Sequence, residues 1–275
     1  VRDMASLRNI AYEACARIKE LRLDIISNLA WVFASLEETE SALFAAIADE
    51  LASRLDDVFF DRRPDTSVDA FAMSILRIMW AFNFAQRLDR DLLAKARAAL
   101  LEIGRSLDAA NASGEFLVAS RTPEPRGSKR QGFRDELRVL VDLEDRLVIQ
   151  KPPGWEVDDD PAVGAPLPLS SFVQALHLPR TWAILSDAQH DCGFLHRLDV
   201  PSSGLILIAK TYAAYYDLQL QLSIGQLTRD YVVLCHGWIA PARCEILARL
   251  RAGKRSALVC ERGKPSGTDV KVLAH

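Results

Sequence analysis

Proline and glycine are distributed very unevenly along this chain of 275 residues. Between Asp3 and Asp108 there is one proline, Pro64, and one glycine, Gly104, whereas the rest of the chain holds eleven prolines and twelve glycines. Because both residues interrupt helices and mark turns, the first part can form long helices and the second part must turn often. The sequence therefore predicts a helical N-terminal part followed by a domain of different architecture.

The first part, residues 1–110, contains two expected helical pairs with the same apolar pattern. In each expected helix the apolar residues recur at spacings of three, four and seven residues, which places them on one face. A shift of 49 residues superposes the first pair on the second, and it matches Ile26 with Ile75, Leu29 with Ile78, Trp31 with Trp80, Phe33 with Phe82, Leu43 with Leu92 and Leu51 with Leu100. Such an internal repeat predicts stacked pairs with an extended surface suited to a long partner.

The third of these helices is expected to open with a capping box over Thr66 to Asp69. The two tryptophans, Trp31 and Trp80, are interpreted as packing residues, with base stacking as the alternative. The run Ser27 to Ala34 resembles the octotricopeptide class of helical RNA-binding repeats and the helical repeats that accompany RAP domains. That resemblance implies an RNA-binding role for the helical part.

A basic, flexible linker is expected at residues 111–136, which are rich in Ser, Gly, Pro and Arg and lack apolar periodicity. The second domain, residues 137–275, then shows short apolar runs at 137–143, 147–149, 205–209 and 231–234. These runs are typical of strands, and helical spacing occurs at 169–178 and 213–222. The expected fold of this domain is α+β with a mixed, mainly antiparallel sheet.

One turn of the second domain has the composition of an active site. Asp199 lies in the run from His196 to Gly204, directly before the apolar strand 205–209. The small residues Ser203 and Gly204 let a ligand approach the backbone. The apolar neighbours of Asp199 are expected to reduce its solvation, and a carboxylate held in this way can act as a nucleophile or a base.

The run from His196 to Gly204 resembles the HRLD-x-x-(T/S)-S-G signature of the RluA-type family of RNA pseudouridine synthases. Three further features of that family follow its order. Lys151 to Gly154 is similar to a K-P-x-G turn, Arg229 to Tyr231 is similar to a K/R-x-Y strand, and Gly263 to Thr268 is similar to a segment that leads into a later strand.

The resemblance implies a cofactor-free isomerisation of uridine in RNA, in which the bond from ribose C1′ to N1 breaks and C1′ joins C5. It implies that Asp199 is the essential carboxylate, that Tyr231 stacks on the uracil, and that Arg197 fills the space of the flipped base or holds the backbone. The other expected RNA or substrate contacts are His196, Ser203, Gly204, Lys151 and Arg229. The family also has a late G-R-x-H-Q-x-R segment whose arginine pairs with the aspartate, and the sequence up to His275 does not contain it.

The expected partner is RNA, whether ribosomal, transfer or organellar. The net charge of −3 excludes a uniformly basic nucleic-acid coat, but residues 243–264 hold seven basic residues against two acidic ones and are expected to face RNA. No apolar stretch is long enough to span a membrane. Five widely spaced cysteines favour a reducing, intracellular compartment, and a monomer is expected.

Three alternatives to the synthase were weighed. Helical repeats with a degenerate synthase domain would hold RNA without modifying it. His190, Cys192 and His196 lie close in sequence, but their spacing is not that of a zinc site, and no metal is expected. A Ser-His-Asp hydrolase lacks its G-x-S-x-G elbow here.

Overall fold

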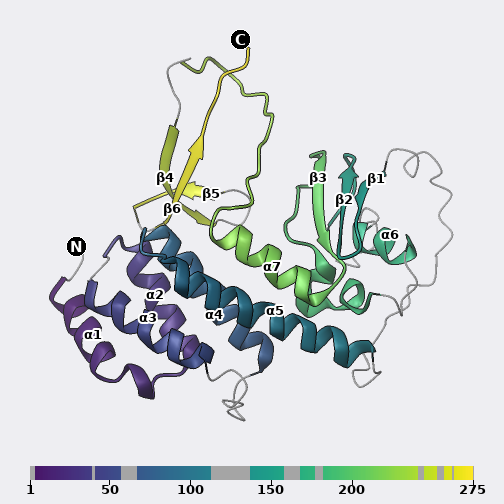
Figure 1. The fold of residues 1–275 in the computed structure, drawn as a ribbon. Helices are drawn as coiled ribbons and strands as arrows, with labels where there is room; N and C mark the ends of the chain where they lie inside the picture. Colours follow the sequence, from purple (N-terminus) through teal and green to yellow (C-terminus); the bar gives the residue numbers. More distant parts are fainter. Residues whose placement is uncertain are drawn as a thin grey trace.

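Three parts of the molecule stand out in Figure 1: a layer of helices, a sheet beside it, and a second sheet that projects from the helices. The computed structural model describes residues 4–38, 41–56, 67–112, 137–157, 168–176, 182–240, 245–252, 257–261 and 263–274. The expected linker therefore lies almost entirely outside the described residues, and its first two residues, Asn111 and Ala112, belong to a helix.

The first part of the chain is helical, as its scarcity of proline and glycine predicts. Its helices are α1 (Met4–Ala16), the short 3₁₀ helix η1 (Ile18–Glu20), α2 (Leu23–Ser35), α3 (Ser41–Asp56), α4 (Val68–Phe84) and α5 (Arg90–Ala112). Helix α2 packs mainly against α4, and α3 contacts α5. The apolar residues matched by the shift of 49 line these contacts, and all of them except the half-buried Leu29 and the two tryptophans are buried.

Helix α4 begins one residue later than the expected capping box. Its N-cap is Ser67, whose hydroxyl accepts a hydrogen bond from the Ala70 amide at 3.2 Å, while Thr66 lies outside the described residues. The expected partner in the box, Asp69, turns its carboxylate to other groups instead: it accepts a hydrogen bond from the Tyr216 hydroxyl at 3.1 Å. A long-range contact therefore replaces the local one.

The second part contains a three-stranded antiparallel sheet and the helices that cover it. Its strands are β1 (Arg138–Asp142), β2 (Arg146–Lys151) and β3 (Gly204–Ala209), in the order β1-β2-β3. Leu147 pairs with Ile208 and Ile149 with Ile206, and all four side chains are buried because alternate residues of a strand share one face. Helices α6 (Leu169–Leu176), η3 (Ala183–Ser186), η4 (Ala188–Gly193) and α7 (Tyr212–Ser223) complete this part.

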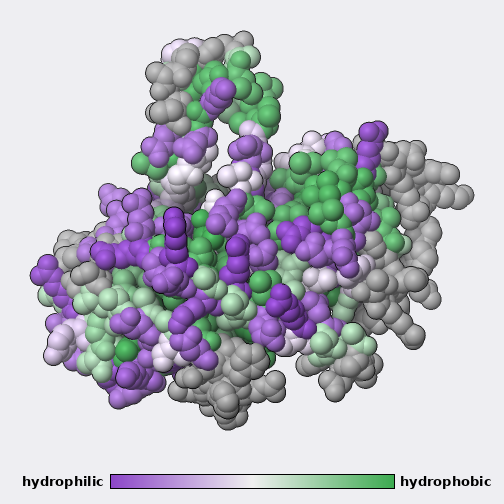
Figure 2. Space-filling view, viewed as in Figure 1, coloured by the Kyte–Doolittle hydropathy of each residue, from purple (hydrophilic) through white to green (hydrophobic). Residues whose placement is uncertain are grey.

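A second antiparallel sheet follows, with the strands β4 (Glu245–Ala252), β5 (Ala257–Val259) and β6 (Lys264–Asp269) in the order β5-β4-β6. The expected α+β fold with mainly antiparallel strands is thus confirmed for the described residues. In Figure 2, hydrophobic surface gathers over the β1–β3 sheet and over this projecting part, whereas the helices present mostly hydrophilic surface.

The strand expected at residues 231–234 is not formed. Residues 228–235 have no regular structure, and Val232 and Leu234 are almost fully exposed. The apolar run is present, but a strand needs a neighbouring edge that supplies backbone hydrogen bonds, and none of the described strands pairs with this segment. That expectation was therefore wrong for the chain as it stands.

Helix α7 joins the two parts, because it packs along α5, as Figure 1 shows. Gly104 of α5 lies so close to α7 that a Cβ atom there would be 2.4 Å from the Cα atom of Ala213. The Asp108 carboxylate, also on α5, accepts hydrogen bonds from the amides of Tyr212 at 2.8 Å and Ala213 at 3.1 Å. A residue of the helical part therefore satisfies two amides at the N-terminus of α7, in addition to the N-cap residue Thr211.

A buried polar cluster lies at the same junction. The His190 ring of η4 contacts the Asp187 carboxylate through Nδ1 at 2.7 Å and the Asp69 carboxylate of α4 through Nε2 at 3.4 Å. The hydroxyl of Tyr216 lies 3.1 Å from Nε2, and the hydroxyl of Tyr212 donates to Asp187 at 2.9 Å. The cluster ties the start of α4 to the second part of the chain.

Candidate active site

The turn that holds Asp199 is fixed from inside the protein by one lysine. Lys151, at the end of β2, has no exposed surface. Its ammonium donates hydrogen bonds to the carbonyl oxygens of Ser202 at 2.6 Å, Asp199 at 3.0 Å, Val200 at 3.2 Å and Pro152 at 3.3 Å. A single cation thus satisfies carbonyls that would otherwise be left without donors.

Backbone contacts join the same two turns. The Gly154 amide donates to the Val200 carbonyl at 2.8 Å, and the Ser202 amide donates to the Asp199 carbonyl at 2.9 Å. Gly154 has a φ of 86°, a left-handed conformation that glycine adopts without strain. The two motifs noted in the sequence, 151–154 and 196–204, therefore form one continuous structure.

Lys151 was expected to contact RNA or substrate, and the structure gives it an internal position. Burial lowers the pKa of its ammonium, and the nearby charge of Asp199 opposes that change. Its hydrogen bonds are to the turn, so any influence of Lys151 on a substrate passes through the position of Asp199.

Asp199 itself is exposed, so the expected desolvation by its apolar neighbours is not found. Val200 is only half-buried and Pro201 is exposed, because the turn stands beyond the end of the β1–β3 sheet. Within the described part of the chain, the Asp199 carboxylate forms no hydrogen bond or ion pair. Its backbone is fixed while its side chain stays accessible, which is the state of a group that can meet a ligand.

His196 is half-buried, and its Nε2 accepts a hydrogen bond from the Leu207 amide at 3.4 Å. Burial lowers the pKa of this imidazole, and the positive charge of Arg229 lowers it further. A neutral ring that accepts at Nε2 carries its proton on Nδ1. This electrostatic effect links His196 to Arg229, a residue from a distant part of the sequence.

The other expected site residues occupy different surroundings. Gly204 is the first residue of β3 and pairs with Lys151 across the sheet, whereas Arg197 and Ser203 are exposed on the turn. Tyr231 is 59% exposed, and its hydroxyl has no hydrogen-bond partner among the described residues. The structure thus brings His196, Arg197, Asp199, Ser203, Gly204, Lys151 and Arg229 together, and it shows no contact of Tyr231 with them.

Two features were missed at the level of sequence. One is the role of Lys151 as the internal support of the turn. The apolar strand before it was a usable signal, because a residue at the end of a buried strand is seldom exposed to water. The other is the cluster around His190, which had no local signal because its members are far apart in the sequence. Among the described residues, no group of His, Cys, Asp and Glu side chains is arranged to hold a metal ion, and no helix could cross a membrane.

This part of the chain is an α+β domain that presents an accessible carboxylate, that of Asp199, on an internally supported turn. Residues 145–273 match the family model described as RNA pseudouridylate synthase. This segment of the chain is similar to the RNA pseudouridine synthases of the RluA type. The match includes the turn of Asp199, β3, α7 and the β4–β6 sheet.

Bacterial relatives agree with the family match. The chain is 39% identical over 138 residues to the ribosomal large subunit pseudouridine synthase C of Haemophilus influenzae, a stretch that covers 48% of this chain and 39% of the relative. It is 29% identical over 164 residues to the ribosomal large subunit pseudouridine synthase D of Nitrosomonas europaea, covering 57% of this chain and 44% of the relative. The chain therefore spans less than half the length of these relatives.

Proposed function

We propose that the protein is an RNA pseudouridine synthase in which Asp199 is the catalytic carboxylate. The observation that carries the proposal is the position of Asp199: an accessible carboxylate on a turn that a fully buried lysine holds through three carbonyls, inside the segment that matches the family. A fixed backbone with a free side chain provides the orientation that a nucleophile or base needs.

The proposed reaction is an isomerisation without a cofactor. The target uridine is flipped out of its stack, the bond between ribose C1′ and N1 of the uracil breaks, the base turns while bound, and C5 forms a bond to C1′. The proton on C5 is then lost to solvent and N1 gains one, so that atoms balance. Asp199 attacks or deprotonates the sugar, and Tyr231 stacks on the base and assists the proton transfer at C5.

The remaining residues of the turn are proposed to hold the nucleotide. Arg197 and Arg229 offer guanidinium groups to the phosphate backbone or to the space left by the flipped base. His196, whose pKa is lowered by burial and by the charge of Arg229, is proposed to support the turn beside Asp199 through its hydrogen bond with the Leu207 amide. The amide edge at Ser203 and Gly204 lets the nucleotide approach the backbone closely.

The helical part is proposed to consist of stacked repeats that add RNA-binding surface. Positions related by the shift of 49 residues meet across the contact between α2 and α4. The Arg77 guanidinium donates to the Asn28 amide oxygen at 2.7 Å, and the rings of Trp31 and Trp80 have centroids 6.4 Å apart. Equivalent residues that contact one another are expected when repeats stack in parallel.

The proposal is tested on the full-length protein with RNA that carries tritium at C5 of uridine, by measuring label release. Asp199→Asn is expected to reduce release to background while RNA affinity stays within about twofold, because the amide keeps the shape of the side chain. Asp145→Asn, in the loop between β1 and β2, is the matched control and is expected to leave release unchanged. Release by Asp199→Asn at the wild-type rate would refute the assignment.

The rival function is RNA binding without modification, in which the helical repeats and a degenerate synthase domain hold RNA. Wild-type protein that binds RNA but releases no more label than Asp199→Asn would establish that rival. If the synthase is active, Tyr231→Phe is expected to lower the rate by about a hundredfold, less than the aspartate change, because the ring still stacks but loses its proton donor.

A further inference from the structure

Three aromatic rings form a row across the outer ends of α2 and α4. The ring centroids of Trp31 and Trp80 are 6.4 Å apart, and Phe84 stacks on Trp80 with centroids 5.1 Å apart and an interplanar angle of 15°. Trp31 is 36% exposed and Phe84 is 38% exposed. Packing between the helices accounts for the buried edges of these rings but leaves aromatic surface open to solvent.

Cations accompany these rings. The Lys264 ammonium of β6 lies 4.7 Å from the centroid of the Trp80 ring, a cation–π contact. Arg77 is exposed and lies three residues before Trp80, so both are on the same side of α4. We call Trp31, Trp80 and Phe84 with Arg77 and Lys264 the aromatic patch.

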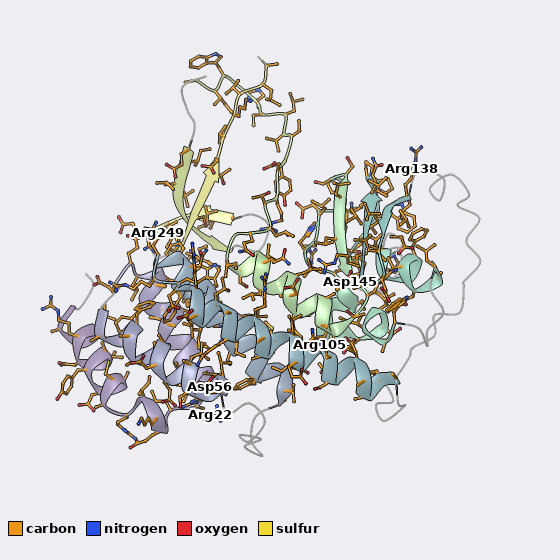
Figure 3. All side chains as sticks on the ribbon, viewed as in Figure 1. Arg22, Asp56, Arg105, Arg138, Asp145 and Arg249 are labelled. Carbon is orange, nitrogen blue, oxygen red and sulfur yellow. The ribbon has the colours of Figure 1, made fainter. Side chains whose placement is uncertain are left out.

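Glu37, the acidic residue that most closely follows α2 in the sequence, forms an ion pair with Arg249. Arg249 of β4 contacts the Glu37 carboxylate at 3.1 Å and donates to the Ser35 carbonyl at 3.0 Å. Figure 3 shows Arg249 where the projecting sheet meets the helices. This contact fixes the sheet on the helical part and places Lys264, on the paired strand β6, over Trp80.

One segment of the chain connects the aromatic patch with the candidate active site. A Cβ atom on Gly225 would lie 3.8 Å from the side-chain amide nitrogen of Asn83, so the chain leaves α7 beside the end of α4 that carries Phe84. The segment that starts there carries Arg229 and Tyr231, and Arg229 acts electrostatically on His196. A strand of RNA that crosses the site can therefore continue onto the patch.

We propose that the aromatic patch binds an unpaired stretch of RNA that flanks the target uridine. This inference rests on the proposed function, to which it adds a second contact surface. The open rings provide faces for base stacking, and Arg77 and Lys264 provide charges for phosphates. The patch mixes aromatic rings with a lysine and a polar Arg77–Asn28 pair. This composition suits a nucleic-acid partner better than a protein partner, because lysine is depleted in the cores of protein interfaces.

The test uses the full-length protein, a fluorescent unstructured oligouridylate and fluorescence anisotropy. Trp31→Leu is expected to weaken binding about tenfold, since one stacked base is lost, while Trp31→Phe stays within about threefold of wild type. Tyr12→Leu, which removes a 73% exposed aromatic side chain on α1, is the matched control and is expected to bind normally. Thermal unfolding of all variants checks that they fold.

Label release from C5-tritiated RNA separates the two proposals. If the patch acts as proposed, Trp31→Leu raises KM and leaves kcat within about twofold, because the patch holds RNA away from the reacting base. Wild-type affinity in Trp31→Leu, with Asp199-dependent release intact, overturns the patch and leaves the synthase standing. Unchanged RNA affinity with an altered sedimentation coefficient would mean that the patch joins copies of the chain, which also overturns the proposal.

Discussion

Lys151 shows how one side chain can decide the geometry of the turn that carries Asp199. A buried lysine is costly unless its protons all meet acceptors, and four carbonyl oxygens within 3.3 Å meet that need here. The carbonyls belong to Asp199 itself, to Val200 and Ser202 after it, and to Pro152. The position of Asp199 is therefore set by a residue that is fully buried.

Replacing this lysine is expected to disturb stability and activity together. Lys151→Met keeps most of the volume but removes the donor, which leaves buried carbonyls unsatisfied. We expect the free energy of unfolding to fall by about 3 kcal/mol, measured by urea denaturation, with a loss of label release. Lys95→Met, which breaks the exposed ion pair with Asp56, should change stability by less than about 1 kcal/mol. Equal effects of the two changes would contradict the role given to Lys151.

His190 predicts a pH dependence of stability. Burial opposes its charge, but hydrogen bonds to Asp187 and Asp69 raise the pKa of His190 to about 9. The ordinary pKa in an unfolded chain is about 6.5, so His190 contributes stability that is fully present below pH 6.5 and is lost as pH rises toward 9. The same hydrogen bond lowers the pKa of Asp69, whose contribution is lost in acid instead.

We expect the free energy of unfolding to fall by about 3 kcal/mol between pH 6.5 and pH 9, and His190→Gln to remove most of that slope. His236→Gln, at an exposed histidine, should keep the slope of the wild type. Urea denaturation at a series of pH values measures both. A wild-type profile that is flat over this range would mean that the folded His190 is neutral.

At the scale of elements, α7 depends on its contact with α5. Gly104 is inside a helix, where glycine is normally less favourable than alanine, but its missing side chain lets the two helix backbones approach. Gly104→Val would place a Cβ atom 2.4 Å from the Cα atom of Ala213, so the helices must separate.

We expect Gly104→Val to lower the free energy of unfolding by more than about 3 kcal/mol, because backbone atoms cannot give way as a side-chain tip can. The same new residue at an exposed position of α5, Ala98→Val, should cost about 0.5 kcal/mol through helix propensity alone. Thermal or urea unfolding of the two variants measures the difference. Similar stabilities would show that α5 and α7 are not closely packed.

At the scale of the whole molecule, the helical part and the second, α+β part share one hydrophobic core. Asp108 caps α7, Asp69 meets His190, and Arg249 holds the β4–β6 sheet on the end of α2. Each of these contacts joins residues that are far apart in the sequence. The part that contains the β1–β3 sheet and α7 is therefore stabilised by contacts with the helices that precede it in the chain.

Residues 137–275 alone are expected not to fold stably, because removal of residues 1–136 exposes the apolar side of α7 and leaves its N-terminus without Asp108. The measurement is a comparison of cooperative unfolding and sedimentation for this fragment and the full chain. A monomeric fragment that unfolds with the same midpoint as the full chain would show that the two parts are independent.

The sequence by itself determined the local features of this protein. Scarcity of proline and glycine predicts the helices up to residue 112, short apolar runs predict β2 and β3, and the 196–204 motif marks the turn of Asp199, because all of these depend on neighbours in the chain. Only the tertiary structure decided which of these features meet. It turned Asp69 from a capping residue into a partner of His190, buried Lys151 under the turn it precedes, and left residues 231–234 without a strand partner, because such contacts depend on distances between remote segments.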